Sequence, residues 1–106
     1  MIAIMLLTFD RLKVAKITLE AVAKNLSTPE DVWMHIADGG SSQEYRDELV
    51  ELAHKHYGDK VSVTNSEGKG YGGNYNVATQ LVHQIADLVL PLEDDWQLTR
   101  DRKSVV

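Results

Sequence analysis

The sequence of 106 residues contains no cysteine. This absence excludes a disulfide framework and a thiolate metal site, and it is compatible with a cytoplasmic location. A long apolar run is also missing, because the opening stretch at 1–7 is too short for a bilayer span and lacks the basic flank of a secretion signal. We therefore expect no membrane span and place the protein in the cytoplasm.

The sequence also lacks an excess of basic residues: it has 16 acidic residues and 11 lysines and arginines, which gives a net charge of −5. The basic residues are scattered, which argues against a nucleic-acid partner and favours small molecules or proteins. The hydrophobic fraction of 43% and the charged fraction of 25% are near those of ordinary folded domains. A chain of this length is expected to form a single domain over 1–106.

Apolar runs alternate with amphipathic stretches along the chain. Residues 2–7 are continuously apolar, which is typical of a strand buried on both faces and predicts the centre of a sheet. Apolar residues then step by three and four positions from Leu12 to Leu26, as on the buried side of a helix. The same alternation predicts two more helices and further strands at 32–37, 61–64 and 87–92.

The resulting order is βαβαβαβ, and with right-handed crossovers it predicts a three-layer α/β sandwich with a mostly parallel, Rossmann-like sheet. Asp10 is expected to cap the first helix, and Ser41 with Glu44 has the spacing of a capping box before the second. The glycine-rich stretch 68–73 is expected to form a flexible turn before the third helix. Residues 87–92 are expected to be a buried strand.

Polar or glycine-rich groups follow each predicted strand. In parallel sheets of this kind, ligands bind outside the carboxyl ends of the strands, at the point where the strand order reverses. We therefore expect four separate stretches to converge on one rim and to form a site there. These stretches lie at 8–11, 38–41, 65–74 and 93–95.

Three consecutive acids, Glu93, Asp94 and Asp95, end the last of these strands. In an extended strand Glu93 and Asp95 would point the same way, about 7 Å apart, with Asp94 pointing opposite. A hard divalent ion with oxygen ligands would turn the repulsion of this pair into attraction. The alternative is a solvated acidic turn.

The other motifs also have two interpretations each. The backbone N–H groups of 68–73 could approach a phosphate, but the stretch lacks the ending of a P-loop and follows the third strand, so it could equally be a simple turn. Asp38 could accept from a nucleobase N–H or belong to ordinary turn chemistry. His35, within a strand, is interpreted as a semi-buried histidine with its hydrogen bonds satisfied. Nucleophilic catalysis has no support, because cysteine and a Gly-x-Ser-x-Gly turn are both absent.

Together, the stretches Thr8 to Arg11, Ala37 to Ser41, Asn65 to Asn74 and Leu92 to Asp95 resemble, in their order, the motifs of glycosyltransferase family 2 and related GT-A transferases. The resemblance implies a domain that binds a nucleoside diphosphate sugar, commonly a UDP-sugar, with Mn²⁺ or Mg²⁺ for inverting glycosyl transfer. It implies base contacts from Thr8, Asp10, Arg11 and Asp38, nucleoside contacts from Lys69, Gly70 and Asn74, ligand contacts from Glu93 and Asp94, and a metal ligand in Asp95.

The chain departs from the family pattern in two ways. Gly39 stands where the family often has a second acid, and the chain ends about ten residues after the acids, so we expect the acceptor-binding half and its catalytic base to be missing. No catalytic residue is therefore assigned. The alternatives are a non-catalytic interaction domain, which self-associates through an uncovered sheet edge, and a sugar-phosphate nucleotidyltransferase. The latter should carry its glycine-rich loop directly after the first strand, where this chain has 8–11.

Overall fold

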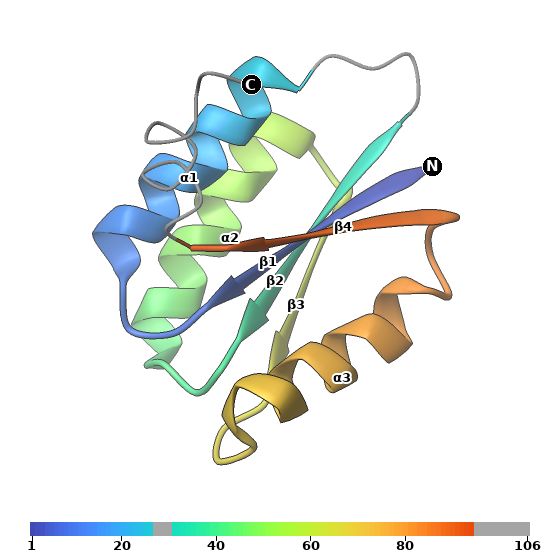
Figure 1. Ribbon diagram of the computed structural model, residues 1–106. Coiled ribbons are helices and arrows are strands. Elements are labelled where there is room, and N and C mark those ends of the chain that lie inside the picture. The colour runs from blue at the N-terminus through green and yellow to red at the C-terminus, as the bar shows by residue number, and fades with distance from the viewer. Residues whose placement is uncertain (27–30, 95–106) are drawn as a thin grey trace, which may run out of the picture.

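The computed structural model describes residues 1–26 and 31–94. Within these residues, four strands form one parallel sheet in the order β3-β2-β1-β4 (Figure 1). This confirms the predicted α/β fold and its Rossmann-like character. The elements in chain order are β1 (Ile2–Thr8), α1 (Leu12–Asn25), β2 (Val32–Asp38), α2 (Gln43–Tyr57), β3 (Val61–Asn65), α3 (Gly70–Val82) and β4 (Leu88–Glu93).

Strand β1 is the centre of the sheet, as its apolar run predicted. All seven of its residues are buried. Its side chains alternate between two cores: Ile4 and Leu6 pack with residues of α1 and α2, whereas Met5 packs with residues of α3. Because both of its faces are covered, β1 holds a fixed position to which the loops at its end are attached.

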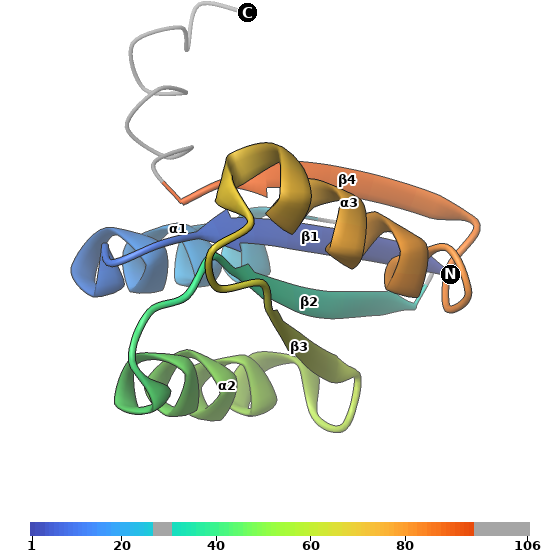
Figure 2. The same cartoon turned by 90° about the horizontal axis from the view of Figure 1, so that it is seen from below.

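The helices cover both faces of the sheet, with α1 and α2 on one side and α3 on the other (Figure 2). Ala15, Leu19 and Val22 form the buried side of α1, as their spacing predicted, whereas Leu26 lies beyond the helix end and is exposed. Full burial of a leucine such as Leu19 stabilises the fold by about 1.5–3 kcal/mol. Of the helices in 1–26 and 31–94, none is long and apolar enough to cross a membrane.

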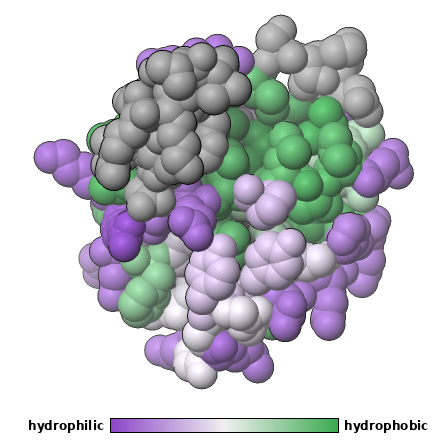
Figure 3. All heavy atoms as spheres, in the orientation of Figure 1, coloured by the Kyte–Doolittle hydropathy of each residue, from purple (hydrophilic) through white to green (hydrophobic). Residues whose placement is uncertain are grey.

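The prediction of a buried strand at 87–92 is wrong, because β4 lies at an edge of the described sheet. It pairs with β1 on one side only, and Leu88 and Leu90 are 52% and 36% exposed. Figure 3 shows hydrophobic side chains gathered on the face where β4 lies in Figure 1. Pro91 fits this position, since proline within a sheet is confined to edges, strand starts and bulges. Within β4 only Val89 and Leu92 are partly buried, one against each core, and the other residues up to Glu93 are exposed.

The helix starts also differ from their predicted signals. Asp10 does not cap α1, because the N-cap position is Arg11 and makes no side-chain cap bond, while Asp10 adopts a left-handed φ of 50°. Helix α2 is capped by Ser42, whose hydroxyl accepts from the Tyr45 N–H at 3.2 Å. Helix α3 begins at Gly70, so residues 70–73 of the predicted glycine turn 68–73 form its first turn.

Candidate functional site

A pocket of about 620 Å³ opens at the carboxyl edge of the sheet, between the ends of β1 and β4. From β1 the chain proceeds to β2 on one side, whereas β4 joins β1 on the other, so the strand order reverses here. Such a switch point is where open α/β sheets bind ligands. The pocket is lined by Leu7, Thr8, Phe9, Arg11, Gly39, Gly68, Gly70, Tyr71, Asn74, Glu93 and Asp94.

The lining draws on all four stretches that were expected to converge. Asp10, Asp38 and Lys69 adjoin lining residues in the chain without lining the pocket, and Asp95 lies outside the described residues. Phe9, Gly39, Gly68 and Tyr71 lie in the predicted stretches and also line the pocket, although the sequence assigned no ligand contact to any of them. The predicted residues that do line the pocket are Thr8, Arg11, Gly70, Asn74, Glu93 and Asp94.

Asp94 is built into the scaffold at the end of β4. It is 7% exposed, and its carboxylate accepts from the Thr8 hydroxyl at 3.2 Å and from the Phe9 N–H at 3.4 Å. The Arg11 guanidinium lies 3.6 Å from its other oxygen. Its backbone carbonyl accepts from Thr18 in α1 at 2.6 Å. The middle acid therefore ties β4 to the turn after β1.

A directed chain of hydrogen bonds runs into this carboxylate from α2. The Arg11 N–H donates to the Tyr45 hydroxyl at 3.0 Å, and that hydroxyl bonds to the Thr8 hydroxyl, which in turn donates to Asp94. Burial raises the pKa of Tyr45, the bonds from Thr8 and Arg11 oppose that rise, and the charges of Asp94 and Asp38 add to it. The tyrosine therefore stays protonated at neutral pH and donates to Thr8.

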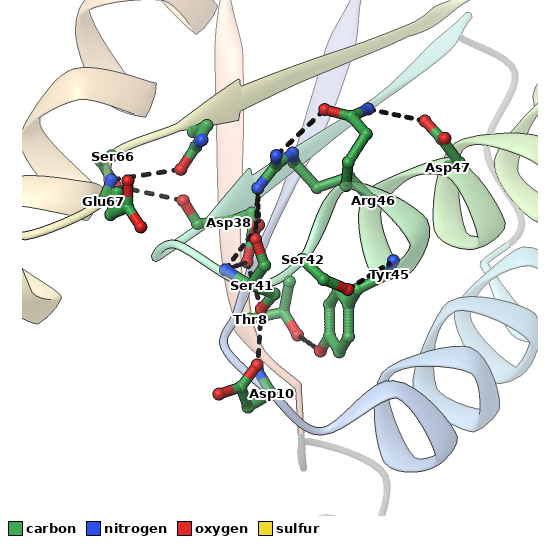
Figure 4. Close-up of polar contacts among 12 residues, drawn as sticks. Thr8, Asp10, Asp38, Ser41, Ser42, Tyr45, Arg46, Asp47, Ser66 and Glu67 are labelled. Carbon is green, nitrogen blue, oxygen red and sulfur yellow. Dashed lines mark hydrogen bonds and ion pairs between the residues drawn. The ribbon is translucent and has the colours of Figure 1, made fainter.

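Asp38, at the end of β2, is completely buried, and Figure 4 shows its polar contacts. Its carboxylate accepts from the Ser41 N–H at 3.0 Å and the Ser41 hydroxyl at 2.7 Å, and it forms an ion pair with Arg46 at 2.8 Å. The Ser41 hydroxyl also accepts from the Asp10 N–H at 2.9 Å, and this bond links the turns after β1 and β2. A base contact by Asp38 stays a prediction, and it would require this carboxylate to leave Ser41 and Arg46.

The start of α3 is fixed to the end of β2 by buried polar side chains. The Asn74 amide donates to the Ala37 carbonyl at 2.9 Å, and the Ser66 hydroxyl donates to the Asn74 oxygen at 2.6 Å. Gly40 is required nearby, because it has a φ of 113° and an added Cβ would lie 3.0 Å from the Glu67 backbone. Asn74 thus supports the wall of the pocket on which Gly70 and Tyr71 lie.

Two aromatic rings line the pocket and remain exposed to solvent. Phe9 is 54% exposed and Tyr71 is 60% exposed. The Tyr71 hydroxyl donates to the Glu93 carboxylate at 3.2 Å, and its pKa is raised by desolvation and by this acceptor. The wall thus combines apolar ring surface with a carboxylate and a guanidinium. Such a mixture is typical of small-molecule sites.

The acidic residues that the structure describes do not lie together as the ligands of a metal ion would. Glu93 bonds to Tyr71 on α3, whereas Asp94 faces Thr8 and Arg11, which is the divergence expected of neighbours in a strand. Within 1–26 and 31–94, no three histidine, cysteine, aspartate or glutamate residues lie close enough to hold an ion. These residues alone therefore do not fit a divalent cation, and the Mn²⁺ or Mg²⁺ site at Asp95 stays a prediction.

This sequence matches no protein-family model, and no curated protein is significantly similar to it. Its motifs and their order are thus the basis of the resemblance described above. The chain forms a four-stranded parallel β/α domain with a pocket at the switch point of its sheet.

Proposed function

We propose that this pocket binds a nucleoside diphosphate sugar, as the donor site of a glycosyltransferase. The observation that carries the proposal is the position of the pocket between the ends of β1 and β4, which is the ligand position of open α/β sheets. Its volume of about 620 Å³ lies within the range of small-molecule sites. Six of the residues to which the transferase interpretation assigned ligand contacts line this pocket.

The charges of the pocket suggest how the ligand lies. Arg11, half exposed at the rim, can donate charge-assisted hydrogen bonds to a diphosphate. The first turn of α3 begins at Gly70 in the lining, and the N–H groups of a helix start favour anions. The exposed Glu93 carboxylate is suited to accept from sugar hydroxyls. We therefore place the diphosphate between Arg11 and α3, with the sugars toward β4.

In the proposed transfer, an acceptor hydroxyl attacks the anomeric carbon from the face opposite the diphosphate, and the bond to the diphosphate oxygen breaks with inversion. Arg11 and the α3 start would stabilise the charge that develops on this leaving group. The hydroxyl proton must pass to a base, and we assign that role to none of the described residues. The proposal therefore concerns donor binding, with transfer dependent on groups beyond the described pocket.

Replacement of Arg11 by glutamine is expected to weaken UDP binding about tenfold or more, because hydrogen bonds to charged groups contribute about 1.5–3 kcal/mol. Glutamine keeps the backbone N–H that donates to Tyr45, so this contact with α2 is retained. Isothermal titration calorimetry with UDP and a UDP-sugar measures the effect. Lys13→Gln, at an exposed position in the first turn of α1, is the matched control.

Two outcomes would count against the donor site. One is the absence of measurable heat when the wild-type chain is titrated with UDP in the presence and absence of Mn²⁺. The other is equal affinity for UDP in wild type and Arg11→Gln. The metal is tested separately with Asp95→Ala. If Asp95 is a metal ligand, this variant should lose the part of the UDP affinity that depends on Mn²⁺.

The exposed edge of β4 favours a second candidate, a self-associating interaction domain. Leu88 and Leu90 present apolar surface on a strand that pairs on one side only within the described sheet, and such edges are templates for pairing with another chain. An antiparallel pair of β4 strands centred on Leu90 would place Asp87 of one copy opposite Glu93 of the other. These like charges would oppose the dimer.

For this candidate, Asp87→Asn is expected to strengthen dimerisation several-fold, because the symmetric pair contains the repulsion twice and each such contact is worth roughly 0.2–1 kcal/mol. Added salt should strengthen the wild-type dimer for the same reason. Sedimentation velocity over a concentration series measures both, with Asp59→Asn as a control at an exposed acid before β3. A monomer at every concentration would rule out the candidate.

A further inference from the structure

Arg11, which lies at the rim of the pocket, is held through both its backbone and its side chain. Its N–H donates to the Tyr45 hydroxyl at 3.0 Å, and its guanidinium lies 3.6 Å from the Asp94 carboxylate. The preceding residue, Asp10, has a left-handed φ of 50°, which is uncommon for residues other than glycine. Because local preference does not favour this shape, the turn depends on the bonds that its two N–H groups donate to Ser41 and Tyr45.

The hydrogen bonds of Tyr45 have a fixed direction. A tyrosine hydroxyl has one hydrogen to donate. The Arg11 N–H can only donate, so it occupies an acceptor position of that hydroxyl, and the hydroxyl hydrogen is left for Thr8. The single hydrogen of the Thr8 hydroxyl is in turn left for Asp94, where the distance is 3.2 Å. Tyr45 therefore determines that Thr8 donates to this carboxylate.

These bonds form a closed circuit that begins and ends at Arg11. It runs from the backbone N–H through the two hydroxyls to one oxygen of the Asp94 carboxylate. The other oxygen of that carboxylate faces the Arg11 guanidinium. Tyr45 and Asp94 are each 7% exposed, whereas 57% of the Arg11 side chain is exposed. A buried chain of hydrogen bonds thus orients an exposed cation.

Tyr45 itself belongs to α2 and does not line the pocket. Its ring packs in the core that α1 and α2 share with the sheet. A ligand in the pocket therefore meets Thr8 and Arg11 but not Tyr45. Any effect of the Tyr45 hydroxyl on ligand binding must be transmitted through the residues to which it bonds.

We propose that Tyr45 is a positioning residue, which orients the Arg11 guanidinium for the diphosphate without touching the ligand. This inference rests on the proposed donor site and adds to it a residue that determines the affinity for the anion. Without the hydroxyl, the Arg11 N–H loses its acceptor and the Thr8 hydroxyl is free to turn away from Asp94. The guanidinium then samples more orientations, and more of the binding free energy is needed to order it.

The test compares Tyr45→Phe with the wild type by isothermal titration calorimetry, with UDP and inorganic pyrophosphate as probes. The variant should bind both probes about fivefold more weakly, because a typical hydrogen bond contributes a factor of this order. Tyr57→Phe is the matched control, since it removes the hydroxyl of another α2 tyrosine, one without a hydrogen-bond partner among the described residues. This control should leave both affinities unchanged. Circular dichroism checks that each variant is folded at the titration temperature.

A double-mutant cycle with Arg11→Gln distinguishes positioning from a general effect on the fold. If Tyr45 acts through the guanidinium, Tyr45→Phe should not weaken UDP binding further once Arg11 is replaced. A general loosening of the pocket would weaken UDP binding alike in both backgrounds. Thr8→Val breaks the same circuit at its next bond, and it takes the place of Tyr45→Phe in the cycle if that variant does not fold.

The outcomes separate this inference from the proposed function. Unchanged affinities for UDP and pyrophosphate in folded Tyr45→Phe would overturn the positioning role while leaving the donor site in place. Equal losses of UDP affinity with and without the Arg11 guanidinium would do the same. A folded wild type that binds neither probe would overturn the donor site and this inference together.

Discussion

Arg46→Met is expected to lower the free energy of unfolding by about 3–5 kcal/mol, because it leaves the buried carboxylate of Asp38 without its cation. The Asp38 side chain is completely buried and that of Arg46 is 13% exposed, so water cannot replace the lost partner. The same guanidinium nitrogen also donates to the Ser41 carbonyl at 2.6 Å. Urea denaturation followed by circular dichroism measures the change.

The double variant Asp38→Asn/Arg46→Met should recover part of this loss, since it removes the uncompensated charge together with its partner. Lys16→Met is the matched control, because its ion pair with Glu48 has side chains that are 41% and 52% exposed. Exposed pairs typically contribute less than about 1 kcal/mol. A loss for Arg46→Met as small as that for Lys16→Met would refute the role of Arg46 as a structural counter-ion.

The protein is expected to lose about 3 kcal/mol of stability between pH 6.5 and pH 4 through His35 alone. Burial lowers the pKa of His35 from 6.5 to about 4. The unfolded chain then binds a proton in this window that the folded chain does not, so stability from this group is complete above pH 6.5 and falls as the pH drops toward 4. The neutral ring is satisfied by Ser62 at 2.6 Å and Thr64 at 3.0 Å.

Urea titrations at a series of pH values isolate this contribution by comparing the wild type with His35→Gln. The variant keeps an amide donor and acceptor but does not titrate, so its stability should decline less steeply over the same window. His83→Gln removes an exposed histidine and should follow the wild-type profile. Parallel profiles for wild type and His35→Gln would contradict the assignment.

Much of the fold could be predicted from the sequence, because local patterns and global topology agree. The apolar run of β1 and the three-and-four spacing of Leu12 to Val22 each predicted the element that forms. The interpretation of His35 as a satisfied histidine is confirmed, although the residue is fully buried. The prediction that 87–92 form a buried strand was wrong, because an apolar run does not show whether a strand lies inside a sheet or at its edge.

The convergence of the site could be predicted, since the carboxyl ends of parallel strands must share an edge. The direction of each side chain could not. Asp38 meets Arg46 because the Arg46 side chain, eight positions later in α2, reaches back to its carboxylate. Tyr45 joins Thr8 across 37 positions of the chain, and only the packing of α2 against the end of β1 brings them together. The same is true of the Phe9 ring over Gly39.

The pairing of the first strand with the last affects how the chain folds during synthesis. Ile2 lies beside Leu88 and Leu7 beside Glu93, so β1 leaves the ribosome long before its second neighbour exists. Until then the nascent chain carries an apolar strand with one open edge, a form prone to aggregation. Contacts between distant positions close slowly. The pocket, which needs Glu93 and Asp94, can therefore form only when all of the described chain has been translated.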